Sequence, residues 1–242
     1  MKGALITFEG TEGSGKSTHI QLLAERLRES GKTVRTLREP GGTAIGEEIR
    51  HTLKHSHQNQ AMMAEAELLL MNASRAQLVR EVIRPALATG EVVLCDRYYD
   101  STVAYQGHGR QLNLEIVRTI IEFAIEGVRP HLTFLLSVPV EVSEVRRIER
   151  QQAGLLVEPS PHPGDPTKRN EPMRDRMEEA DRAFFERVDQ GYQAIAAAEP
   201  RRVCLIDATQ PLESVRTAIW KRVDSLLSDF AATSHEVNHG NR

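Results

Sequence analysis

The sequence predicts an α/β fold of three layers, in which a five-stranded parallel sheet is flanked by helices. Short apolar runs typical of buried strands alternate along the chain with longer segments of helical periodicity. Strands that alternate with helices favour a parallel sheet covered on both faces. The chain shows neither an internal repeat nor a second hydrophobic core, so we expect a single domain over residues 1–231.

The expected strands are short apolar runs that end at glycine, proline or polar turns. They occupy residues 4–8, 33–37, 92–95, 132–136 and 203–206. The first helix is expected to begin near Ser17 and to stop at Gly31. Pro85 is predicted to bend the longest helical segment. The remaining helices are expected at residues 43–54, 62–89, 114–126, 139–152 and 212–230.

Two segments do not follow the alternation of strands and helices. Residues 153–172 contain five prolines together with glycine, serine and asparagine, which predicts a long mobile loop. Residues 232–242 are polar and lack a helix cap, which predicts a flexible tail.

Composition and charge limit the possible partners. The chain has 242 residues, of which 40% are hydrophobic and 27% charged, as in ordinary globular proteins. A formal net charge of −3 gives no reason to expect binding to nucleic acid or membranes, so anion binding would depend on local arginines. Cys95 and Cys204 lie in apolar runs and read as free thiols of a reducing compartment. We therefore expect a cytoplasmic protein.

A glycine-rich loop joins the first strand to the first helix and matches the pattern G-x-x-x-x-G-K-[ST]. Its backbone N–H groups and the helix N-terminus would surround the phosphates of a nucleoside triphosphate. Lys16 would reach the terminal phosphates, and the Ser17 hydroxyl could bind magnesium. The expected ATP contacts are Gly10, Thr11, Glu12, Gly13, Ser14, Gly15, Lys16, Ser17 and Thr18.

The loop occurs in switches, motors and kinases, so other features must distinguish them. The N-K-x-D motif of GTPases is absent from the sequence, and the chain is short for a motor. A small-molecule kinase needs a second anion site opposite the loop and a lid that carries arginines. Arginines that follow the second and third strands, and others between residues 146 and 176, supply both features.

Further blocks closely resemble the thymidylate kinase family over residues 3–225. They are L-R-E-P-G-G-T from Leu37, D-R-Y-Y-D-S-T-V-A-Y-Q-G from Asp96, D-R-M-E from Asp175, F-F-E-R from Phe184 and I-D-A-T-Q-P from Ile206. The resemblance implies a P-loop nucleoside monophosphate kinase fold, ATP and Mg²⁺ as cofactors, dTMP as acceptor, and a homodimer. It also implies the bacterial type of enzyme, whose catalytic arginine lies in the lid.

The resemblance assigns roles around the phosphates. Arg38 would clamp the monophosphate of the acceptor, and Arg75 would be a second contact to the same nucleotide. Asp96 would hold magnesium directly or through water. Arg97 would bridge the donor and acceptor phosphates. Gln210 lies in a segment, residues 208–212, that resembles the one beside the donor adenine.

The resemblance also assigns roles around the sugar and base of the acceptor. Tyr105 would pack under the sugar, where a 2′-hydroxyl would collide. Thr102 and Gln106 would hydrogen-bond the thymine edge and hold the sugar face. Glu9 would lie near the acceptor sugar and the metal. Met71 stands where most relatives have an aromatic residue that stacks on thymine, which predicts looser base discrimination.

The lid, expected at about residues 146–176, is longer than a short basic lid because of its Pro-rich insert. The P-loop carries Glu12 instead of an arginine, so the catalytic arginine is expected in the lid. Arg150 and Arg174 are favoured because they flank the insert. The full set of candidates is Arg146, Arg147, Arg150, Lys168, Arg169, Arg174 and Arg176.

Two other functions remain open at this point. The chain could be another nucleoside monophosphate kinase with a relaxed base preference, which Met71 favours. It could also be a P-loop protein that binds nucleotides without catalysis, although the intact Lys16, Ser17, Asp96 and Arg97 argue against this.

Overall fold

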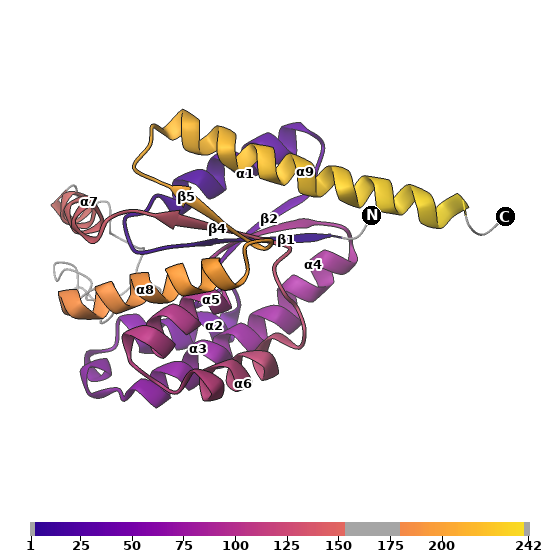
Figure 1. Cartoon of the computed structure of the whole chain (residues 1–242). Coiled ribbons are helices and arrows are strands. Elements are labelled where there is room, and N and C mark those ends of the chain that lie inside the picture. The colour runs from indigo at the N-terminus through magenta and orange to yellow at the C-terminus, as the bar shows by residue number, and fades with distance from the viewer. Residues whose placement is uncertain (1–2, 153–179, 240–242) are drawn as a thin grey trace, which may run out of the picture.

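Five parallel strands form the central sheet of the computed structural model, which describes residues 3–152 and 180–239 (Figure 1). The strands lie in the order β2-β3-β1-β4-β5. Their bounds are β1 (Ala4–Glu9), β2 (Val34–Arg38), β3 (Val92–Asp96), β4 (Leu132–Ser137) and β5 (Val203–Asp207). The predicted α/β fold and all five expected strands are thereby confirmed, each to within one residue at either end.

The strand order reverses between β1 and β3. The connection that leaves β1 leads to β2 on one side of the sheet, whereas the chain after β3 crosses to β4 on the other side. Phe8 of β1 and Arg38 of β2 are both in register with Asp96 of β3. Ligands of open α/β sheets bind outside the carboxyl ends of the strands at such a reversal. The P-loop follows β1 here, and Arg97 follows β3.

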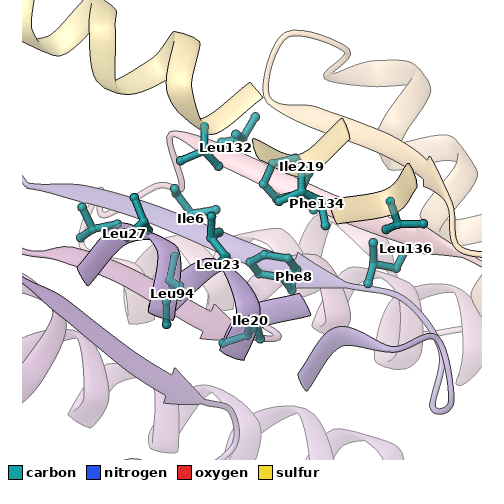
Figure 2. Close-up of a cluster of buried hydrophobic side chains, with 14 of the residues drawn as sticks. Ile6, Phe8, Ile20, Leu23, Leu27, Leu94, Leu132, Phe134, Leu136 and Ile219 are labelled. Carbon is teal, nitrogen blue, oxygen red and sulfur yellow. The ribbon is translucent and has the colours of Figure 1, made fainter. Parts of the chain in front are cut away.

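Helices cover both faces of the sheet (Figure 1). Helices α1 (Lys16–Glu29) and α9 (Leu212–His239) lie on one face. Their apolar side chains pack on alternate residues of the strands, including Ile6 and Phe8 (Figure 2). The other helical elements are α2 (Ala44–Lys54), α3 (Ala64–Leu78), α4 (Arg84–Ala88), α5 (Tyr99–Thr102), α6 (Leu114–Ile125), α7 (Val140–Gln152) and α8 (Arg182–Ala198), with short η1 (His57–Ala61), η2 (Val79–Ile83) and η3 (Val103–Gly109).

The long helix expected at residues 62–89 is divided in the structure. It consists of α3, the π-helical turn η2 and α4. Pro85 has no N–H group with which to continue the α-helical hydrogen bonds. The wider turn lies directly before it, where the N–H of Arg84 bonds to the carbonyl of Val79. The structure thus shows a change of helix type before Pro85, while the predicted bend stays a prediction.

Two helical segments were not predicted, namely α8 and the α5–η3 segment. Asp181 caps α8 by accepting a hydrogen bond from the N–H of Phe184 at 2.7 Å. Glycines permit the close approach of α8 and η3. A Cβ atom on Gly109 would lie 2.6 Å from the ring of Phe184, and one on Gly191 would lie 2.8 Å from His108.

The C-terminal helix is longer than expected. Helix α9 continues to His239, through most of the segment that was predicted to be a polar tail. The expected loop at residues 153–172 lies outside the described residues. Within the two described ranges, no helix is both long enough and apolar enough to cross a membrane.

An ion pair between Asp100 and Arg202 fixes α5 to the start of β5. The guanidinium of Arg202 donates to both carboxylate oxygens of Asp100, at 2.6 and 2.8 Å, and to the hydroxyl of Thr133 at 2.8 Å. Burial raises the pKa of Asp100, and the hydrogen bonds from Arg202 oppose that shift. The side chains of Asp100 and Arg202 are 3% and 11% exposed, so little water is available to replace either partner.

Replacing Arg202 with methionine is expected to lower the free energy of unfolding by about 3–5 kcal/mol, because it leaves the Asp100 carboxylate buried without its partner. Urea denaturation monitored by circular dichroism measures this change. Arg182→Met is the matched control, because Arg182 pairs with Glu141 and Glu186 at the exposed surface. We expect a loss of less than about 1 kcal/mol for this control. Equal losses in the two variants would contradict the importance of the buried pair.

Candidate active site

The glycine-rich loop, residues 10–17, is the P-loop, and its backbone has the positive φ angles that glycine permits. Gly10, Gly13 and Gly15 have φ angles of 130°, 82° and 92°, which residues with a Cβ atom rarely adopt. A Cβ on Gly10 would also lie 2.4 Å from the carbonyl oxygen of Leu136. Helix α1 begins at Lys16, so its N-terminus faces the loop.

The interior of the loop is prepared for an anion. The Nζ of Lys16 donates to the carbonyls of Gly10 and Thr11 at 3.2 and 2.9 Å. The hydroxyls of Thr11 and Ser14 are buried and have no hydrogen-bond partner among the described residues. Burial, with a further contribution from the charge of Arg97, lowers the pKa of Lys16 to about 8. A phosphate chain in the loop would supply negative charge and acceptors to these groups.

Two oxygen ligands suited to magnesium meet beside the loop. The hydroxyl of Ser17, at the start of α1, donates to Oδ2 of Asp96 at the end of β3, at 3.0 Å. Mg²⁺ prefers oxygen ligands and usually keeps several waters or substrate phosphates. Across the described part of the chain, no cluster of three or more His, Cys, Asp or Glu side chains could form a metal site of its own. The pair therefore fits a metal that shares its ligands with a bound triphosphate.

Arg97 is held in an unusual conformation between the loop and a pocket. Its φ angle is 68°, in the left-handed region, and its N–H donates to the carbonyl of Phe8 at 2.9 Å. Its guanidinium donates to the hydroxyls of Ser101, Tyr192 and Tyr105 at 3.1, 3.1 and 3.3 Å. Glu12 of the P-loop lies 3.8 Å from it. The positive charge is thus fixed where the loop and the pocket meet.

The pocket contains most of the residues predicted to bind an acceptor. Met71, Arg75, Arg97, Thr102, Tyr105 and Gln106 all line it. Glu12, Glu39, Pro40, Lys54, Tyr98, Ser101 and Phe185 complete the lining. The predicted acceptor contacts, from α3, the end of β3 and the α5–η3 segment, are thereby brought together.

Arg75 is oriented by two buried partners. It donates to Oε2 of Glu39 at 2.7 and 2.9 Å, and to Oδ1 of Asn72 at 2.9 Å. Burial raises the pKa of Glu39, whereas the charge of Arg75 lowers it. The amide of Gln106 is fixed in a similar way, by a 2.9 Å hydrogen bond to the buried carboxylate of Glu67. The pocket walls are therefore held by polar contacts behind them.

Glu9 lies behind the pocket and does not belong to its lining. The N–H of Tyr98 donates to its Oε1 at 2.8 Å, and the hydroxyls of Ser101 and Tyr192 donate to its Oε2 at 2.5 and 3.1 Å. Burial, and then the charge of Asp100, raise the pKa of Glu9 to about 7. In this structure Glu9 organises the hydroxyl groups around Arg97.

Other predicted residues lie away from the pocket. Arg38 ends β2 in register with Asp96, but its exposed side chain pairs with Glu47 at 3.1 Å. Gln210 is exposed in the turn between β5 and α9, where it donates to Asp207 at 2.8 Å. The roles of Arg38 as a phosphate clamp and of Gln210 as an ATP contact stay predictions.

The lid candidates are described only in part. Arg174 lies outside the described residues, as do Lys168, Arg169 and Arg176. Arg150 belongs to α7, and its side chain is also outside the description. Arg146 donates to the carbonyls of Gly13 and Ala208 at 3.4 and 3.3 Å, which links α7 to the P-loop and to the turn after β5.

Several residues around the site were missed by the sequence prediction. Glu39 and Ser101 stand inside the blocks R-E-P-G-G-T and D-R-Y-Y-D-S and could have been found there. Tyr192 and Phe185 lie on α8, whose spacing of Phe184, Val188 and Tyr192 is helical. Lys54, the last residue of α2, carried no signal, because a lysine at a helix end is usually solvated.

Comparison with known proteins agrees with this geometry. The family model described as thymidylate kinase matches residues 8–219. The thymidylate kinase of Alcanivorax borkumensis is 46% identical over 226 residues, which cover 93% of this chain and 98% of the relative. That of Kosmotoga olearia is 40% identical over 235 residues, with 97% and 99% covered.

A solved structure gives the same result. The crystal structure of thymidylate kinase from Ehrlichia chaffeensis superposes with a TM-score of 0.68 at 28% sequence identity, and covers 92% of this chain and 99% of the other. The matches extend over nearly the whole length of both partners, and they include the P-loop, the end of β3 and the pocket. The chain belongs to the thymidylate kinase family.

Proposed function

We propose that this protein is a thymidylate kinase, which transfers the γ-phosphate of ATP to dTMP and releases dTDP and ADP. The observation that carries the proposal is the position of Arg97, which lines the acceptor pocket and lies 3.8 Å from Glu12 of the P-loop. A guanidinium at this junction could contact the phosphates of both nucleotides. The same position of Arg97 would serve a kinase for another base, which Met71 favours, but membership of the thymidylate kinase family favours dTMP kinase over both alternatives.

The chemistry requires positioning and charge stabilisation more than covalent participation of the protein. An oxygen of the dTMP phosphate attacks the γ-phosphorus in line, and the bond to the β-phosphate oxygen breaks to release ADP. No general base is required, because a monophosphate dianion is already a nucleophile. Lys16 and Arg97 stabilise the charge that develops on the transferred group. We assign the further positive charge to a lid arginine, Arg150 or Arg174.

Ser17 and Asp96 would hold magnesium, and their 3.0 Å contact supports this role. Held there, the ion would supply positive charge against the triphosphate. The backbone N–H groups of the P-loop and Lys16 would orient the triphosphate, whereas Gln210 and the turn after β5 would lie beside the adenine.

The acceptor would occupy the pocket with its phosphate toward Arg97. Arg75, Thr102 and Gln106 would face the nucleoside, and Tyr105 would lie under the sugar. Met71 supplies a polarisable sulfur and Phe185 an aromatic ring to the lining, so both offer surface against a base. This supports base binding without the stacking aromatic residue on α3.

We further propose that residues 1–231 act as one kinase domain with a lid at about residues 146–176, in the cytoplasm. Cys95 and Cys204 are both free thiols, buried and half-buried respectively, as expected in a reducing compartment.

The proposed activity predicts a marked preference among acceptors. Coupled ADP release with ATP and magnesium is expected to be fastest with dTMP, when dTMP, dUMP, UMP, CMP, AMP and GMP are offered separately. The missing methyl group of dUMP should lower kcat/KM by about 10-fold or more, the usual scale for a methyl-sized difference. A higher value for another monophosphate would refute the assignment to dTMP. Turnover of none of them would favour a protein that only binds nucleotides.

The magnesium site predicts a second result. Asp96→Asn is expected to raise the Mg²⁺ concentration that gives half-maximal rate by about 10- to 100-fold, because it removes a carboxylate from the metal site. The rate is measured against free Mg²⁺ at constant ATP. Asp224→Asn, on the exposed surface of α9, is the control and should leave the curve unchanged. An unchanged curve for Asp96→Asn would remove Asp96 from the metal site.

We propose that the protein is a homodimer, as the family resemblance implies. Large apolar side chains are exposed on α3 and α6, which contact each other: Leu69 is 57% exposed, Ile116 57% and Phe123 77%. Such a face would be covered by the same face of a second copy.

Sedimentation velocity at micromolar concentration is therefore expected to give the mass of two chains. Phe123→Glu should shift the protein toward the monomer, because it places a charge in the apolar face. Val145→Glu, which changes an exposed apolar residue on α7, is the control and should remain dimeric. A monomeric wild type would contradict the proposal.

A further inference from the structure

The hydroxyl of Tyr192 lies at the centre of a polar cluster, and none of the predicted roles includes this tyrosine. It is 3.1 Å from the guanidinium of Arg97, 2.9 Å from the hydroxyl of Ser101 and 3.1 Å from the carboxylate of Glu9. The Tyr192 side chain comes from α8 and is 2% exposed. Three elements, β1, α5 and α8, thus meet at this one hydroxyl.

The direction of the Arg97 side chain depends on such contacts. An arginine has a long and flexible side chain, and holding it in one rotamer costs conformational entropy. Ser101 and Tyr105 accept hydrogen bonds from it, but both belong to the α5–η3 segment that directly follows Arg97. Among the described residues that accept a hydrogen bond from the guanidinium, Tyr192 alone comes from another part of the fold.

Tyr192 itself is held firmly. Its ring packs edge-on against Tyr105, with centroids 6.3 Å apart, and the adjacent Gly191 lets α8 approach His108 closely. Burial raises the pKa of Tyr192 well above its ordinary value, so its hydroxyl keeps a proton. A neutral phenol can accept from Arg97 and donate to Glu9 at the same time. The hydrogen bonds then run from the cation through Tyr192 to the carboxylate.

We propose that Tyr192 is a positioning residue for phosphoryl transfer, which fixes the guanidinium of Arg97 between the P-loop and the acceptor pocket through its hydroxyl. The inference rests on the proposed kinase function. It adds that the orientation of the bridging arginine is set by α8, through a residue that does not line the pocket. A small displacement of a group that stabilises the transition state can lower the rate by about 10²-fold.

The test is Tyr192→Phe in the full-length protein, with ATP, magnesium and dTMP. We expect kcat to fall by about 10- to 100-fold, while the KM values for both nucleotides change by less than about 3-fold, because the arginine matters most in the transition state. The ring remains in place, so the midpoint of thermal unfolding should fall only slightly. Tyr99→Phe is the control, since Tyr99 is a buried tyrosine of α5 that does not line the pocket. Its kcat should equal that of the wild type.

A double-mutant cycle separates positioning from general support of the fold. In an Arg97→Ala background, Tyr192→Phe should cause no further loss beyond about 2-fold, because the group that it positions is absent. Turnover is followed with radiolabelled ATP, which detects slow transfer. A full additional loss in that background, or an unchanged kcat of Tyr192→Phe in the wild-type background, would overturn the inference and leave the kinase assignment intact. A wild type without turnover would overturn both.

Discussion

The hydrogen bond from the N–H of Arg97 to the carbonyl of Phe8 is the contact on which the rest of the site depends. It adds one hydrogen bond to the pairing of β1 and β3 after the last residue of β3. At this point the segments that follow the two strands separate. On one side the chain enters the P-loop, and on the other it turns through the left-handed conformation of Arg97. Because β1 and β3 are parallel and in register, the loop after β1 brings Ser17 next to Asp96 at the end of β3.

The charged groups at the carboxyl ends of β1 and β3 interact with one another and are supported by a second set of charged groups behind them. Lys16 and Arg97 lie close enough for the charge of Arg97 to lower the pKa of Lys16, and the carboxylates of Asp96, Glu12 and Glu9 oppose that effect. Behind them, the Asp100–Arg202 pair holds α5 to the start of β5. Such buried pairs add little net stability compared with apolar packing, but the loss of one partner is costly. Their evident effect here is to fix the position of α5, which carries Ser101 and Thr102.

Much of this arrangement could be predicted from the sequence, because its signals are local. The apolar runs specify the strands, and the glycines with Lys16 and Ser17 specify the P-loop. The α5–η3 segment was missed because Gly107 and Gly109 interrupt the helical pattern, and they are there for packing against other elements. Helix α8 was missed although its periodicity is clear. The pairing of Arg38 with Glu47, and the position of Lys54 at the pocket, depend on contacts between separate elements that no local pattern contains.

The glycine contacts between η3 and α8 have a consequence for how this protein can diverge. Neither Gly109 nor Gly191 lines the pocket or belongs to the P-loop, yet an added methyl group at Gly109 would overlap Phe184, and one at Gly191 would overlap His108. The overlap would separate the helix that carries Tyr192 from the segment that carries Tyr105. Glycine at these two positions is therefore a condition for the site, although neither residue takes part in its chemistry.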